Sequence, residues 1–221
     1  MTSIIMKLKN FRLAKPLAIN IAALAAVLAL IPPAMAEGTT EGDPAAGQAK
    51  AATCAACHGM DGNSVNPQWP SLAGQHASYI VDTLAAFKNG TRSDVLMNAQ
   101  AMILPDSDLA DVAAYFAAQA PTQRTADPEL AKAGERLYRG GDMENDVSAC
   151  MACHGPSGRG NAPAGYPSLT GQHAVYTAKQ LNDYKSGART SDGDQQIMRN
   201  ISANLSAEQI EAVAAYIQGL R

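Results

Sequence analysis

The cysteines of this chain form two motifs of the type Cys-x-x-Cys-His, CAACH at residues 54–58 and CMACH at residues 150–154, and no other cysteine is present. Two thiols at this spacing can bind zinc, form a redox pair, or add to the vinyl groups of a haem whose iron the adjacent histidine binds. A zinc site requires a further thiolate or imidazole at zinc spacing, and a thioredoxin-type pair requires a strand followed by a helix; the sequence shows neither. The motifs therefore predict two covalently attached haem c groups, with these residues as thioether and iron-binding positions: Cys54, Cys57 and His58 for the first, and Cys150, Cys153 and His154 for the second.

A haem c iron that only carries electrons needs a second axial ligand. Met198 is the only methionine after the second motif, and the internal repeat described next aligns it with Met97. We predict these two methionines as the second ligands, because thioether ligation suits a c-type electron carrier. Two alternatives remain at this point. The methionines could be ordinary core residues, or the duplicated His76 and His173 could form bis-histidine haems.

The chain repeats itself outside the cysteine motifs as well. PSLAGQHASY at 70–79 recurs as PSLTGQHAVY at 167–176, with eight of ten positions identical, and LADVAAYF at 109–116 aligns with IEAVAAYI at 210–217. Self-similarity of this kind indicates a duplicated structural unit. We predict one domain over 37–125 and a second over 126–221, joined near a polar stretch that contains two prolines.

Both copies show the periodicity of helices and no convincing strand. In each closing segment, apolar residues recur at i, i+3, i+4 and i+7, which predicts a helix with one buried face. A middle helix is expected to end at Gly90 in the first copy and at Gly187 in the second. Ser206 and Gln209 have the spacing of a capping box. The predicted fold class is all-α, and because only 5% of residues are aromatic, we expect the haems to complete two small cores.

The first 36 residues resemble an export signal. Four basic residues precede an apolar run that is shorter than a comfortable membrane span, and Ala34-Met35-Ala36 has the small-x-small form of a cleavage site. We expect cleavage after Ala36 and a periplasmic location, with a retained anchor as the alternative. Without 1–36, all 20 acidic and 13 of the 17 basic residues remain, a net charge of −7. Such a charge disfavours nucleic acid and suits a partner with a positive patch.

Taken together, the motifs CAACHG, PSLAGQH, Met97 and LADVAAYF, followed by CMACHGPSGRGN, YPSLTGQH, Met198 and AEQIEAVAAYIQGL, resemble the di-haem cytochrome c4 family over residues 43–221. The resemblance implies two tandem cytochrome c-type haem domains facing each other, with haem edges linked by propionates. It also implies that the carbonyls of Pro70 and Pro167 accept the second ring proton of the iron-binding histidines. The recurring pairs Lys88/Lys185 and Arg92/Arg189 could contact propionates or be solvated; we favour solvation for the lysines and leave the arginines open.

The expected function is single-electron transfer, without catalysis and without a small-molecule substrate. The resemblance implies a quinol-oxidising complex or another periplasmic donor and a terminal oxidase as partners, and peripheral membrane association is kept as an alternative. A second hypothesis is a haem subunit of a dehydrogenase, such as a flavocytochrome sulfide dehydrogenase. A third, a di-haem peroxidase, requires an open iron site and is disfavoured because a methionine is available at the same position of both copies.

Overall fold

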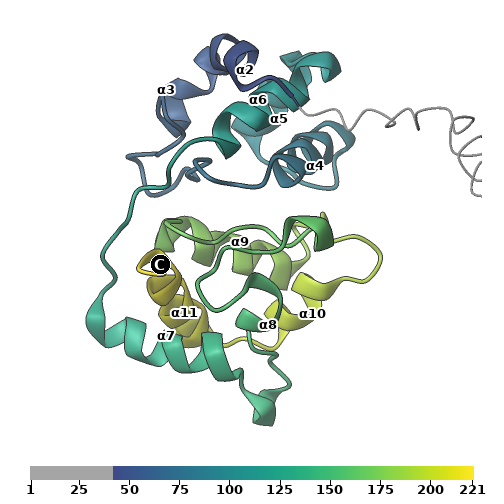
Figure 1. Ribbon diagram of the computed structural model, residues 1–221. Helices are drawn as coiled ribbons and strands as arrows, with labels where there is room; N and C mark the ends of the chain where they lie inside the picture. The colour runs from purple at the N-terminus through teal and green to yellow at the C-terminus, as the bar shows by residue number, and fades with distance from the viewer. Residues whose placement is uncertain (1–41) are drawn as a thin grey trace, which may run out of the picture. The chain divides into compact units, whose positions relative to one another are not determined.

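The computed structural model describes residues 42–221, which belong to one compact unit. The predicted signal segment, 1–36, lies outside these residues. Within the described range the fold is helical, and the only β-pairing consists of two isolated bridges, Asp142 with Val147 and Asn161 with Tyr166. The prediction of an all-α fold is confirmed (Figure 1).

Among residues 42–221, the first repeat has five α-helices and the second repeat has five more. Those of the first repeat are α2 (Pro44–Lys50), α3 (Ala55–His58), α4 (Ala77–Asn89), α5 (Val95–Ile103) and α6 (Leu109–Ala117). Those of the second are α7 (Pro128–Gly140), α8 (Met151–His154), α9 (Ala174–Ser186), α10 (Ile197–Ala203) and α11 (Ala207–Gln218). Short 3-10 turns, among them η3 (Met143–Asn145), fill some of the connections. The order of the helices is the same in both repeats.

A glycine lets the first and last helices of each repeat cross closely. In the second repeat, a β-carbon added to Gly134 of α7 would lie 2.0 Å from the carbonyl oxygen of Ala212 in α11. In the first repeat, a β-carbon on Gly47 of α2 would lie 2.0 Å from the carbonyl oxygen of Asp111 in α6. Only a residue without a side chain allows this approach, so each crossing places the cysteine motif, which follows α2 or α7, beside the closing helix.

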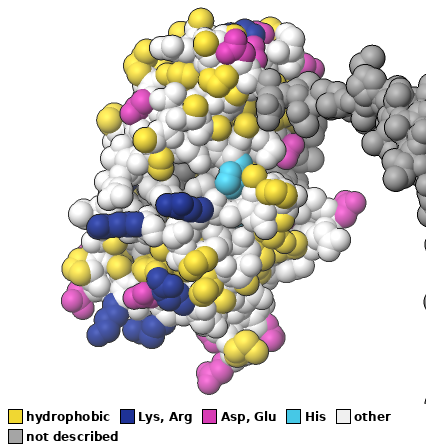
Figure 2. All heavy atoms as spheres, in the orientation of Figure 1, with side chains coloured by type: hydrophobic (Ala, Val, Ile, Leu, Met, Phe, Trp, Pro, Cys, Tyr) yellow, Lys and Arg dark blue, Asp and Glu magenta, His cyan; other side chains and the backbone are white. Residues whose placement is uncertain are grey.

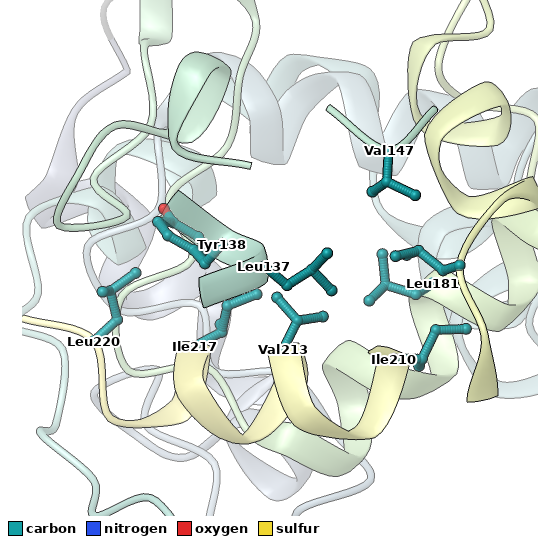
Figure 3. Close-up of a cluster of buried hydrophobic side chains, with 9 residues drawn as sticks. Leu137, Tyr138, Val147, Leu181, Ile210, Val213, Ile217 and Leu220 are labelled. Atoms are coloured by element: carbon teal, nitrogen blue, oxygen red, sulfur yellow. The ribbon is translucent and has the colours of Figure 1, made fainter. Parts of the chain in front are cut away.

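Each repeat has its own small core beside this crossing. In the second repeat, Ile210, Val213 and Ile217 of α11 point toward Leu137 and Tyr138 of α7 (Figure 3). The predicted apolar stripes of both closing helices are buried, which confirms their assignment to the core. The buried stripe residues are Leu109, Val112, Ala113 and Phe116 in α6, and Ile210, Val213, Ala214 and Ile217 in α11.

The predicted helix ends are also observed. Gly90 and Gly187 follow α4 and α9 with φ of 81° and 75°, the left-handed conformation that stops a helix. Ser206 and Gln209 form both hydrogen bonds of the capping box at the start of α11. Residues 118–127 connect α6 to α7 without helical structure. The domain boundary between 125 and 126 falls in this connection and stays a prediction.

Candidate functional site

Each Cys-x-x-Cys-His motif folds into a single helical turn that ends in the histidine. α3 ends at His58 and α8 ends at His154, and the glycine after each has a positive φ, 82° for Gly59 and 77° for Gly155. The backbone therefore turns sharply after the histidine. The motif prolines lie in the segment that returns past the ring: His58 Nδ1 is 2.8 Å from the carbonyl oxygen of Pro70, and His154 Nδ1 is 2.9 Å from that of Pro167.

These contacts fix the protonation of both imidazoles. A carbonyl accepts only from an N–H, so the proton lies on Nδ1 and Nε2 keeps its lone pair. Burial lowers the pKa of both histidines, partly opposed by the hydrogen bonds to the proline carbonyls, so both rings are neutral at physiological pH. Within 42–221, neither ring makes another hydrogen bond. Each motif thus presents a neutral imidazole with a free nitrogen, which is the form that binds iron.

The four cysteines are of intermediate burial, and no disulfide joins any two of them. Cys54 packs against the core of the first repeat and Cys150 against that of the second. Before a haem is attached, burial raises the pKa of the Cys54 thiol and raises that of the Cys150 thiol to about 11, so both thiols are protonated and unsuited to rapid disulfide exchange. In the described residues, no three His, Cys, Asp or Glu side chains converge as a set of metal ligands. The donor set fits covalent haem attachment rather than zinc.

The two candidate methionines lie on equivalent helices, Met97 on α5 and Met198 on α10. Both are half-buried, and Met198 packs against the core of the second repeat. Two other methionines of the first repeat, Met60 and Met102, are exposed. The positions agree with axial ligation by Met97 and Met198, which remains a proposal.

The loops that lead to these methionines are held differently. In the first repeat, Asn98 accepts from the backbone N–H of Asp94 at 2.6 Å and donates to the carbonyl of Phe87 at 2.7 Å. In the second repeat, which has four extra residues here, Arg199 Nε donates to Asp192 Oδ1 at 2.7 Å, and only 4% of the aspartate side chain is exposed. The residue after each methionine therefore fixes its segment to the rest of the repeat. Asn98 does so through its side-chain amide, and Arg199 does so through an ion pair.

The two repeats contact each other through a reciprocal pair of glutamines. Gln75 accepts from the N–H of Ser168 at 2.9 Å and donates to its carbonyl at 2.8 Å. Gln172 does the same with Ser71, with both distances 3.0 Å. Each glutamine side chain thus satisfies both the backbone N–H and the backbone carbonyl of a serine in the other repeat. That serine directly follows the proline whose carbonyl contacts a motif histidine. The repeated GQH sequence was the signal for this contact, but its position between the domains could not be read from the sequence.

The duplicated arginines also join the repeats. Arg92 Nη2 donates to Tyr176 Oη at 2.6 Å, and Arg189 Nη2 donates to Tyr79 Oη at 2.8 Å. Both arginines are buried. Burial by itself raises the pKa of Tyr79, but the charges of Arg189 and Arg92 outweigh it and lower the pKa to about 8. The arginines are therefore structural links across the repeats.

Lys88 and Lys185 are not simply solvated. Lys88 Nζ donates to the carbonyl of Leu104 at 2.6 Å, and Lys185 Nζ donates to the carbonyl of Leu205. Each lysine ties a middle helix to the end of the methionine segment of its own repeat. The expectation of solvated lysines agrees with Lys185, which is exposed, but not with Lys88, which is half-buried and also pairs with Asp106. A lysine stem long enough to reach a free carbonyl gains a hydrogen bond that a helical pattern does not reveal.

His76 and His173 begin α4 and α9, but their surroundings differ. His173 is buried, and its Nε2 donates to the carbonyl of Ser64 in the first repeat at 2.8 Å. His76 Nε2 is buried without a hydrogen-bond partner among the described residues. His173 thus acts in the contact between repeats, which disfavours it as an iron ligand.

Comparison with known proteins supports the same interpretation. The cytochrome c family model matches twice, over residues 44–119 and 131–221. The chain therefore belongs to the cytochrome c family, and each repeat is one cytochrome c domain.

The similar proteins refine this assignment. Cytochrome c4 of Azotobacter vinelandii is 52% identical over 188 residues, which is 81% of this chain and 90% of that protein. The crystal structure of reduced recombinant cytochrome c4 from Pseudomonas stutzeri matches with a TM-score of 0.79 and 49% identity, covering 81% of this chain and all of that one. A thiosulfate dehydrogenase electron acceptor of Stutzerimonas stutzeri is 36% identical over 170 residues, which is 75% of this chain and 78% of that protein.

The predicted relationship to the di-haem cytochromes c4 is confirmed. The chain carries two haem c groups at its two Cys-x-x-Cys pairs, and it is an electron-transfer protein that works with redox partners rather than an enzyme. In the part of the chain that the structure describes, every helix is too short or too polar to span a bilayer.

Proposed function

We propose that this protein is a periplasmic carrier that accepts single electrons from a quinol-oxidising complex or another periplasmic donor and delivers them to a terminal oxidase. The proposed iron ligands are His58 and Met97 for the first haem and His154 and Met198 for the second. The observation that carries the proposal is the duplicated histidine–proline contact, at 2.8 and 2.9 Å, in two otherwise separate cores.

The residues around each site would serve electron transfer by staying in place. When bound, a haem iron accepts and releases one electron by alternating between the ferric and ferrous states. The carbonyls of Pro70 and Pro167 hold each imidazole in one tautomer and one orientation, and such contacts tune the metal they support. Asn98 and the Asp192–Arg199 pair restrain the segments that carry the methionines. A rigid site needs little rearrangement when the charge on the iron changes.

These different contacts beside the two methionines would give the two haems different potentials. Arg199, the residue after Met198, pairs with the nearly buried carboxylate of Asp192, whereas the residue after Met97 is the neutral Asn98. Charges and hydrogen bonds around the iron ligands are among the factors that set a haem potential.

The test is reconstituted turnover. Purified holoprotein is added to a quinol-oxidising complex and a terminal oxidase from the same organism, and oxygen consumption is measured with quinol as the donor. The proposal predicts oxygen uptake that saturates with the holoprotein and disappears without it. Uptake that is independent of the protein would contradict the proposal.

A second candidate is suggested by the relative named a thiosulfate dehydrogenase electron acceptor, at 36% identity. In this candidate the donor is a sulfur-compound dehydrogenase, and the residues of the haem sites keep the same roles. Stopped-flow mixing of the oxidised protein with each reduced donor distinguishes the two candidates. The reduction rate should saturate with the concentration of the physiological donor and not with that of the other donor.

A further inference from the structure

The outer face of α5 is unusually apolar for a solvent-exposed helix. Four large apolar side chains on this nine-residue helix are exposed, with exposed fractions of 92% for Val95, 58% for Leu96, 65% for Met102 and 70% for Ile103. We refer to these four residues as the α5 patch. Apolar side chains gathered on one face of a soluble domain commonly mark an interaction site.

A haem in the first repeat would not cover the α5 patch. Successive residues of an α-helix are about 100° apart, so the four side chains leave the helix about 100–160° away from Met97. Ala101, which is buried, lies on the Met97 side. The patch therefore lies on the same helix as the proposed iron ligand Met97 but points away from the first haem site.

The second repeat lacks this patch. With Met97 aligned to Met198, three of the four positions become Gln196, Ala203 and Asn204, and only Leu96 keeps an apolar counterpart of similar size, Ile197. Both helices occupy the same place in the order of elements. The fold itself thus does not require apolar residues on this face, and the difference belongs to the first repeat alone.

The first repeat around the patch carries an excess of negative charge, because residues 42–125 contain seven aspartates and four lysines and arginines. Asp94 precedes α5 and forms no ion pair among the described residues, and the exposed Asp106, which pairs with Lys88, follows α5. Every lysine and arginine between 42 and 125 is already engaged or buried: Lys50 pairs with Asp108 and Asp111, Lys88 pairs with Asp106, Arg92 contacts Tyr176, and Arg124 donates to carbonyls of both repeats. On the face drawn in Figure 2, most Lys and Arg side chains lie over the middle and lower part, where Figure 1 places α7, α9 and α11, and one lies at the top.

We propose that the α5 patch is the docking surface for one of the protein's redox partners, a protein whose contact face is apolar at its centre and rich in lysine or arginine at its edge. This inference rests on the proposed electron-carrier function and specifies where the partner binds. An apolar centre with a polar rim is the usual composition of a protein interface. The acidic surroundings attract a basic partner and speed its approach, and they disfavour an anionic membrane surface.

The test replaces the patch by the residues of the second repeat. The variant Val95→Gln/Met102→Ala/Ile103→Asn installs side chains that the equivalent positions of the same fold already carry. The control, Met143→Gln, removes a side chain that is 86% exposed on η3 of the second repeat. The probe is a lysine-rich mono-haem cytochrome c, and the second-order rate constant of electron exchange is measured by stopped flow at low and high salt.

We expect the triple variant to react about tenfold more slowly than the wild type with the basic probe, while Met143→Gln stays within about twofold. Reduction by ascorbate, which needs no docking surface, should be equal in all three proteins, and the haem absorbance should confirm that the variant is folded. Wild-type exchange should also slow as salt increases. If the triple variant exchanges at the wild-type rate, the docking proposal is wrong although the carrier function stands.

Two other results would also overturn the docking proposal. One is a dimer of the wild type that the triple variant abolishes, because the patch would then join two copies of the chain. The other is wild-type binding to anionic vesicles that the variant loses. In contrast, failure of the wild type to exchange electrons with any redox protein would contradict the proposed function itself.

Discussion

The crossing of α7 and α11 makes a sharp test of the packing that supports the second haem site. In Gly134→Ala, the added methyl group would lie 2.0 Å from the carbonyl oxygen of Ala212 and 2.8 Å from Cβ of Tyr216. Atoms in ordinary contact are about 3.5 Å apart. The helices would therefore have to separate by more than about 1 Å, which would disturb the core formed by Leu137 and Val213.

Overpacking of this kind costs about 1–3 kcal/mol and occasionally more, and backbone contacts cannot be relieved by rotating a side chain. We expect a loss near the upper end, about 3 kcal/mol in the free energy of unfolding. Because the two repeats form one compact unit of about 180 residues, that corresponds to a fall of roughly 6–12 °C in the melting temperature.

The matched control is Gly140→Ala, at the last residue of the same helix. A β-carbon there has no atom within 4 Å, and replacing a helical glycine by alanine gains up to about 1 kcal/mol. Thermal unfolding of both variants is followed by far-ultraviolet circular dichroism and by the haem absorbance. If Gly134→Ala melts within a few degrees of Gly140→Ala, the close helix crossing is not what holds this repeat together.

Three further predictions follow from the haem sites and the contact between repeats. Met198→Ala should lower the potential of the second haem and leave the first unchanged, and Met97→Ala should do the converse; redox titration that shows both potentials at wild-type values would refute the ligand assignment. Gln172→Ala leaves the N–H and carbonyl of Ser71 buried without partners, at a cost of about 1–3 kcal/mol each, so calorimetry should show the two repeats unfolding more independently; a single unchanged transition would contradict this. Burial, together with the charge of Arg124, lowers the pKa of His173, so the unfolded chain takes up a proton near pH 6.5 that the folded chain does not. Stability should therefore fall as the pH drops below about 6.5, and denaturant titrations at pH 7 and pH 5 should show a smaller fall in His173→Gln, where that group is absent. An equal fall in both proteins would refute this role of His173.

Much of the architecture could be predicted from the sequence because the same structural unit occurs twice, so each pattern could be compared with its copy. The apolar stripes of α6 and α11, the glycines after α4 and α9, and the capping box at Ser206 are local signals, and local interactions decide helix ends. The cysteine motifs were equally readable, since covalent haem attachment needs two thiols and a histidine at fixed spacing.

The contacts between the repeats could not be predicted. Gln75 and Gln172 bind backbone groups about a hundred residues away, and nothing in the local pattern indicates such a partner. Arg92 and Arg189 were left open because a cation just after a helix can face solvent, a propionate or a tyrosine with the same sequence signal. The apolar composition of α5 is present in the sequence, but only the structure shows that Val95, Leu96, Met102 and Ile103 are exposed.

The central claim is that each repeat holds one covalently bound haem whose iron has a histidine and a methionine as ligands. The most direct measurement is a redox titration of the purified holoprotein, combined with haem quantification after acid extraction. The account predicts two haems per chain that remain with the polypeptide, two one-electron steps, and a methionine–iron band in the ferric spectrum. One haem per chain, extractable haem, or a ferric spectrum with an open or bis-histidine iron would contradict it.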